Sequence, residues 1–169
     1  MTDKSSFSAE EWNELLAATM LAGMVVIAAD PSGIVSMLKE SMANAGALAD
    51  AQRNADTNVL IKSIVADFQT SEGRTAAREK IRQTLAGATS PQDAQTKSLA
   101  ALKSVAALLE EKAPEDAPLV KSWLQSIGNR TAQAANDGGF LGFGGVAVSD
   151  AEQATLDQLA AALAKPATS

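Results

Sequence analysis

The side chains that could carry chemistry in this chain are carboxylates, because it contains no histidine and no cysteine. Their absence excludes Ser-His-Asp and Cys-His catalysis, thiolate or imidazole metal sites and disulfides. A bound metal would need oxygen ligands, which favours the hard cations Ca²⁺ and Mg²⁺. Candidate ligands stand at helix boundaries: Asp30 follows the first apolar segment, and Asp137, Asp150 and Glu152 flank a glycine-rich stretch.

Three interpretations of these acids stay open. Asp30 and Asp150 can be helix-start residues that offset the helix dipole. A metal site is the second interpretation, although Asp137-Gly138-Gly139 lacks the alternating acids of an EF-hand. The third is a paired-carboxylate hydrolase, in which Asp30 and Asp137 would meet in space. Because no other catalytic pattern is present, we expect a protein that is not an enzyme.

The glycine-rich segment at residues 138–145 holds five of the eleven glycines and two of the four phenylalanines. Such density lowers helix propensity, so it suits a chain that needs positive φ or a close backbone contact. No Gly-Lys-Ser/Thr follows and no strand precedes, so it is not a nucleotide-binding motif. Phe140, Leu141 and Phe143 either contact a protein partner, including a second copy, or fill the domain's own core.

Charge and hydropathy exclude two classes of partner. The formal net charge of −6 argues against nucleic-acid binding, which requires clustered Lys and Arg. The apolar run from Leu15 to Ala29 is too short for a membrane span and follows three glutamates rather than a basic region. It is typical of a buried central helix. We therefore expect a cytoplasmic protein that contacts neither nucleic acid nor membrane.

The elements that must position these residues are helices, because no alternating β-branched run occurs. Ser8 and Glu11 form a capping-box pattern, Phe7 can pack against Trp12, and the helix should run to about Ala29. Ser90 and Pro91 begin another helix in the same way. The remaining helices are expected at about 34–44, 59–69, 71–87, from Pro118 onward, and after Ser149.

These patterns predict an all-α fold, a single compact domain over residues 1–169 with about seven helices and a buried first helix. Residues 1–6 and 165–169 are expected to be disordered. Both tryptophans should be core anchors, and Leu119, Trp123 and Ile127 should face inward. The local group of cations should lie on a solvated helix face: Arg74, Arg78, Lys80 and Arg82.

Two segments resemble the Ala-Asp-Gly-x-Ile/Val-Ser-x-x-Glu element of TerB-like (tellurite-resistance-associated) helical domains. They are Ala28-Ala29-Asp30-Pro31-Ser32-Gly33-Ile34, and Ala134-Ala135-Asn136-Asp137-Gly138 continuing into Val148-Ser149-Asp150-Ala151-Glu152. The resemblance implies a TerB-like all-helical architecture, a role in stress response, and metal binding by Asp30, Asp137 and Glu152. The stretch from Trp123 through the glycine-rich segment also resembles a segment of uncharacterised bacterial helical proteins, which implies no activity.

The leading hypothesis is a non-enzymatic cytoplasmic binding or scaffolding module that uses the 138–145 segment and needs no cofactor. The alternative is a stress-response protein that binds Ca²⁺ or Mg²⁺ through its acidic turn residues.

Overall fold

The computed structural model describes residues 2–27, 48, 50–51, 54, 57–136 and 150–164. Within these ranges all regular secondary structure is helical and no strand occurs, so the predicted all-α class is confirmed. The helices are η1, a 3-10 helix (Lys4–Ser6), and the α-helices α1 (Ala9–Ile27), α3 (Val59–Phe68), α4 (Ser71–Thr84), α5 (Pro91–Lys112), α6 (Ala117–Asn136) and α7 (Asp150–Leu163). The described residues thus form six α-helices rather than about seven. The helix expected at 34–44 lies outside them, as do residues 165–169.

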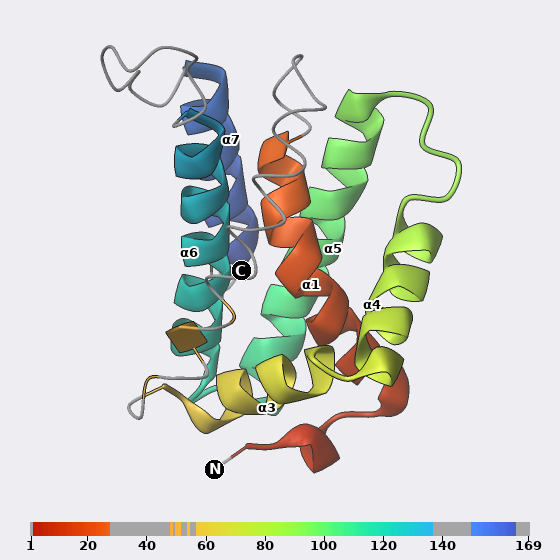
Figure 1. Ribbon diagram of the computed structural model, residues 1–169, viewed down its shortest axis with the longest axis vertical. Helices are drawn as coiled ribbons and strands as arrows, with labels where there is room; N and C mark the ends of the chain where they lie inside the picture. The colour runs from red at the N-terminus through yellow and green to blue at the C-terminus, as the bar shows by residue number, and fades with distance from the viewer. Residues whose placement is uncertain are drawn as a thin grey trace.

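Helix α1 is the centre of the bundle (Figure 1). It runs between α6 and α7 on one side and α4 and α5 on the other, while α3 crosses the end at which α1 begins. Its side chains are buried almost all round, including Leu15, Ala18 and Val25. The predicted buried first helix is therefore confirmed, because a helix apolar on every side must be surrounded by others.

The start of α1 matches the sequence pattern. Glu11 N donates to Ser8 Oγ at 3.2 Å, and Ser8 N donates to Glu11 Oε2 at 2.7 Å, which completes the capping box. The Phe7 and Trp12 rings are 5.9 Å apart. Within the segment 1–6, Lys4–Ser6 forms the 3-10 helix η1, and Asp3 caps it by accepting from Ser5 N.

Helix α5 also begins as predicted. Ser90 Oγ accepts a hydrogen bond from Asp93 N at 3.1 Å, and Pro91 occupies the first helical position. Before it, α4 ends at Thr84, and Gly87 takes a positive φ of 71° in the turn. A side chain at Gly87 would be strained, so glycine suits this reversal between α4 and α5.

Close packing joins α6 to α1 and α7. A Cβ atom added at Gly128 would overlap the Leu159 Cδ2 methyl group and lie 3.3 Å from the Ala22 carbonyl oxygen. Glycine therefore allows three helices to approach at this point. The contact fixes the position of α6, which carries one wall of the candidate site.

Candidate functional site

An open groove of about 340 Å³ lies between α6 and the residues that lead into α3. We call it the α3–α6 groove. Its apolar lining comes from both sides, with Ala51 and Ile61 facing Leu119 and Trp123. Serine hydroxyls of α6 and polar side chains of residues 50–58 complete the lining. A concave surface with apolar walls and a few polar groups is typical of a binding site.

Asn58 sets the start of α3 and joins it to α6. Its Oδ1 accepts from Leu60 N at 2.9 Å and from Ile61 N, so it is the N-cap of α3. Its Nδ2 donates to Asp116 Oδ1 at 2.6 Å, one residue before α6 begins. The hydrogen bond from Asn58 holds the pKa of Asp116 below its usual value. One amide side chain thus fixes the distance between the two walls.

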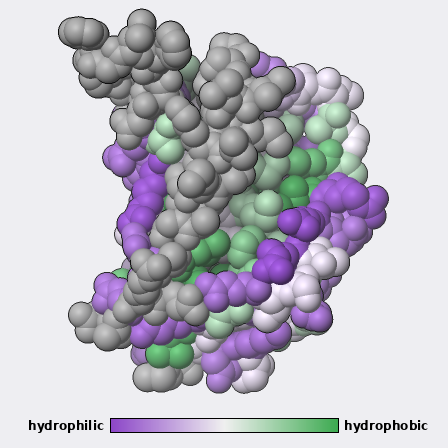
Figure 2. Space-filling model, viewed as in Figure 1, coloured by the Kyte–Doolittle hydropathy of each residue, from purple (hydrophilic) through white to green (hydrophobic). Residues whose placement is uncertain are grey.

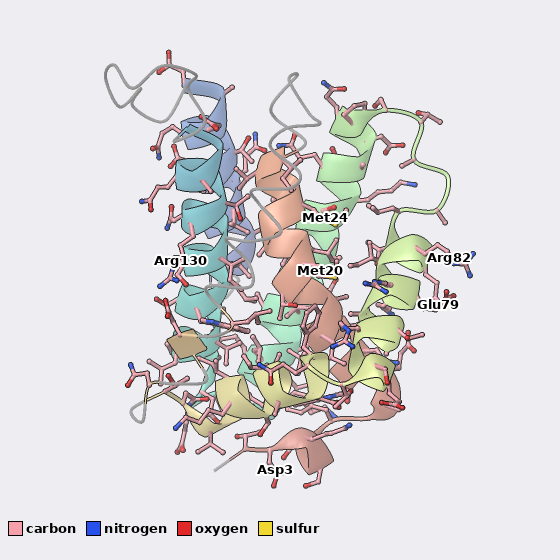
Figure 3. All side chains as sticks on the ribbon, viewed as in Figure 1. Asp3, Met20, Met24, Glu79, Arg82 and Arg130 are labelled. Atoms are coloured by element: carbon pink, nitrogen blue, oxygen red, sulfur yellow. The ribbon has the colours of Figure 1, made fainter. Side chains whose placement is uncertain are left out.

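A second link crosses the groove nearer the C-terminal end of α6. Arg130 Nη1 donates to Asp50 Oδ2 at 2.7 Å (Arg130 is labelled in Figure 3). Both side chains are about half exposed, so the ion pair contributes no more than about 1 kcal/mol to stability. Its chemical importance is that the two charges cancel, which leaves this part of the groove without a net charge.

Trp123 forms part of the groove wall and differs from Trp12. Trp12 is buried, and its Nε1 donates to Asp67 Oδ2 at 2.6 Å. Trp123 is only partly buried, yet its Nε1 is shielded from solvent and has no hydrogen-bond partner among the described residues. A buried donor without a partner costs about 1–3 kcal/mol. The prediction that both tryptophans are core anchors therefore holds for Trp12, whereas Trp123 packs against the core from the groove.

The position of Leu119 shows that the predicted inward face of α6 was wrong at this residue. It is 54% exposed at the edge of the groove, and the buried stripe runs instead through Val120, Leu124 and Ile127. Val59 is the other large apolar side chain exposed among the described residues. The Asn58–Asp116 hydrogen bond brings both to the same end of the bundle.

The sequence-predicted site residues are only partly within the described chain. Phe140, Leu141 and Phe143 lie outside it, and so do Asp30 and Asp137. Glu152 lies in the first turn of α7 and is 5% exposed. Figure 1 shows α1 and α6 ending, and α7 beginning, at the same end of the bundle. Among the residues described, no three acids gather to hold a metal ion.

Sequence reasoning did not find the α3–α6 groove. Its two polar links join Asn58 to Asp116 and Asp50 to Arg130, pairs that stand 58 and 80 residues apart in the chain. No local pattern encodes such pairings. The one available signal was Trp123, a large amphipathic residue and the single aromatic side chain of α6.

Comparison with known proteins gives no relative: no protein-family model matches the chain, and no match was found among curated proteins or solved structures. Across the described helices, none combines the length and apolar character that a bilayer crossing would require.

Proposed function

We propose that this chain is a non-enzymatic cytoplasmic helical binding module that contacts a protein partner through the α3–α6 groove and the glycine-rich 138–145 segment. The observation that supports this proposal is the open groove, with the Trp123 ring in its wall and Leu119 exposed at its edge. Exposed apolar residues beside a concave surface are typical of interaction sites. The TerB-like architecture is also a proposal, and it rests on the sequence element around Asp30 and Asp137.

The geometry of α6 connects the two proposed contact regions. Leu119, Trp123, Ser126 and Arg130 follow one another at intervals of three or four residues, so they form one stripe along the helix. The helix ends at Asn136, immediately before the glycine-rich segment. A partner lying along this stripe would contact Leu119, Trp123 and Arg130 in turn.

The partner should present an apolar anchor with little charge around it. Leu119 and Trp123 offer apolar surface, and the Asp50–Arg130 pair adds no net charge. The glycine-rich segment of a second copy is uncharged and apolar, so self-association is the first form of the proposal to test.

Sedimentation equilibrium over a range of protein concentrations tests this proposal. We expect reversible association that weakens about tenfold or more in Leu119→Lys and in Phe140→Ser/Phe143→Ser. Ala107→Lys, on the exposed face of α5, is the matched control and should leave association unchanged. Association that persists in both variants, or double-serine substitution that unfolds the domain, would contradict the proposed contact role.

A second candidate function is the binding of Ca²⁺ or Mg²⁺ by Asp30, Asp137 and Glu152. The observation in its favour is Glu152, a carboxylate that is only 5% exposed at the end of the bundle where α1 and α6 also end. Carboxylate oxygens are the ligands that these hard cations prefer. This candidate predicts that millimolar metal raises the melting temperature by several degrees.

The metal experiment compares thermal unfolding in chelator with unfolding in Ca²⁺ or Mg²⁺. Asp137→Asn should abolish the rise in melting temperature, while Asp157→Asn on the exposed face of α7 should preserve it. An identical melting temperature with and without metal would remove this candidate.

A further inference from the structure

A separate cavity of about 210 Å³ lies between α1, α4 and α5. Helices α4 and α5 both pack along α1 but scarcely touch each other, so a gap remains between them. Short side chains keep it open: Ala17 on α1, and Ala101 and Ser104 on α5. Leu21 and Val105, both almost fully buried, close its inner end. Figure 2 shows hydrophobic residues at the surface in the region between α1 and α4.

The mouth of this cavity is charged and its charges are unbalanced. Lys80 Nζ lies 3.0 Å from Glu14 Oε1 and also bonds Glu10 Oε1. Burial lowers the pKa of Lys80, but its hydrogen bonds to the two glutamates outweigh this effect and raise it, so the ammonium stays charged. Glu14 and Lys80 line the cavity, and Glu10 lies beside it, four residues before Glu14 on α1. The group of two carboxylates and one ammonium therefore carries one negative charge. The expected solvated position of Lys80 is thus only partly correct, because its side chain is 18% exposed.

Apart from the third N–H of Lys80, the remaining hydrogen-bonding capacity at the mouth consists of acceptors. Glu14 and Glu10 each use one carboxylate oxygen for Lys80 within the described structure. The Thr84 and Ser104 hydroxyls donate to carbonyl oxygens of their own helices, so each can still accept a hydrogen bond. The mouth therefore suits a positively charged hydrogen-bond donor, and the interior suits an apolar group.

We propose that this cavity binds a small organic cation, a primary ammonium group attached to an apolar body the size of a benzene ring. The apolar body lies against Leu21, Ala101 and Val105, and the ammonium donates to the second carboxylate oxygen of Glu14. The size is appropriate, because apolar cavities of about 150 Å³ in proteins hold benzene. The added positive charge balances the two glutamates, whereas a carboxylate ligand would meet their repulsion.

Titration of the full, isotope-labelled chain with benzylammonium, followed by protein NMR, tests the proposal. We expect saturable shifts around the cavity in α1, α4 and α5, with a Kd on the order of 1 mM for a ligand of about eight non-hydrogen atoms. Benzyl alcohol and benzoate, which have nearly the same shape, should bind about tenfold more weakly or not at all. Equal binding of all three would overturn the assignment to an ammonium compound.

Two substitutions locate the site. Ala101→Leu should fill the cavity and abolish binding, while Ala107→Leu, on the exposed face of the same helix, should leave it intact. Glu14→Gln should weaken benzylammonium binding about tenfold, and Glu79→Gln, on the outer face of α4, should not. Undiminished binding by both the Ala101 and the Glu14 variants, or no saturable shift with the unsubstituted chain, would refute the proposal.

Discussion

Replacing each tryptophan by phenylalanine compares the indole N–H environment of Trp12 in the core with that of Trp123 in the groove wall. The chemical change is the same at both positions, namely loss of the indole N–H and of part of the ring. At Trp12 the lost N–H donates to the Asp67 carboxylate at 2.6 Å. At Trp123 the N–H is shielded from solvent, and no residue in the described part of the chain accepts a hydrogen bond from it. The two variants should therefore differ strongly in stability.

The magnitudes follow from these environments. The smaller ring costs about 1 kcal/mol of apolar burial at either position. Trp12→Phe also loses a hydrogen bond to a charged group, worth about 1.5–3 kcal/mol, so it should destabilise the fold by about 3 kcal/mol. Trp123→Phe removes a donor whose burial costs about 1–3 kcal/mol, which offsets the smaller ring. Its net effect on the free energy of unfolding should be close to zero.

Urea unfolding followed by far-ultraviolet circular dichroism measures both free energies without relying on tryptophan fluorescence. Each variant serves as the control for the other, because the substitution is identical. The reasoning is refuted if the two variants lose the same stability, or if Trp123→Phe loses more. In either case the Trp123 indole would have a hydrogen-bonded environment that the structure does not show.

Three further predictions concern described side chains. Burial raises the pKa of Asp67, but hydrogen bonds from Lys4 and Trp12 outweigh it and hold the pKa below its usual value. Its carboxylate therefore stabilises the fold above its unfolded-state pKa, and this stabilisation should be lost as pH falls below about 4. The free energy of unfolding of Asp67→Asn should then depend less on pH in this range. A pH profile identical to that of the unsubstituted chain would contradict the predicted role of Asp67. Gly128→Ala should lower stability by about 1–3 kcal/mol in thermal melts, because its Cβ would overlap Leu159; an unchanged melting temperature would show that the helices can separate at no cost. Asn58→Ala should lower the free energy of unfolding in urea by about 1–2 kcal/mol, because it loses the α3 cap and the hydrogen bond to Asp116. Asn129→Ala, at an exposed position of α6, is its control.

The helix starts show how much of the fold local sequence can predict. Ser8 and Glu11 satisfy each other's backbone donors, and Ser90 accepts from Asp93 N while Pro91 has no N–H to satisfy. The sequence pattern is therefore sufficient to locate the starts of α1 and α5. The burial of α1 was also predictable, because a helix with apolar residues on every side cannot face water. The absence of histidine and cysteine limits the possible chemistry through composition alone.

The rotation of α6, the α3–α6 groove and the cavity between α1, α4 and α5 depended on tertiary structure. Leu119 was expected inside but lies outside, because helical periodicity leaves neighbouring stripes nearly equivalent until packing at Gly128 and the Asn58–Asp116 bond selects one. Likewise, Lys80 belonged to a basic run in sequence, and only the approach of α4 to α1 pairs it with Glu10 and Glu14. By itself the sequence determined the helical segments of the described chain and which chemistry is impossible. Tertiary structure decided which side chains meet, because contacts between residues far apart in the chain depend on how whole helices pack.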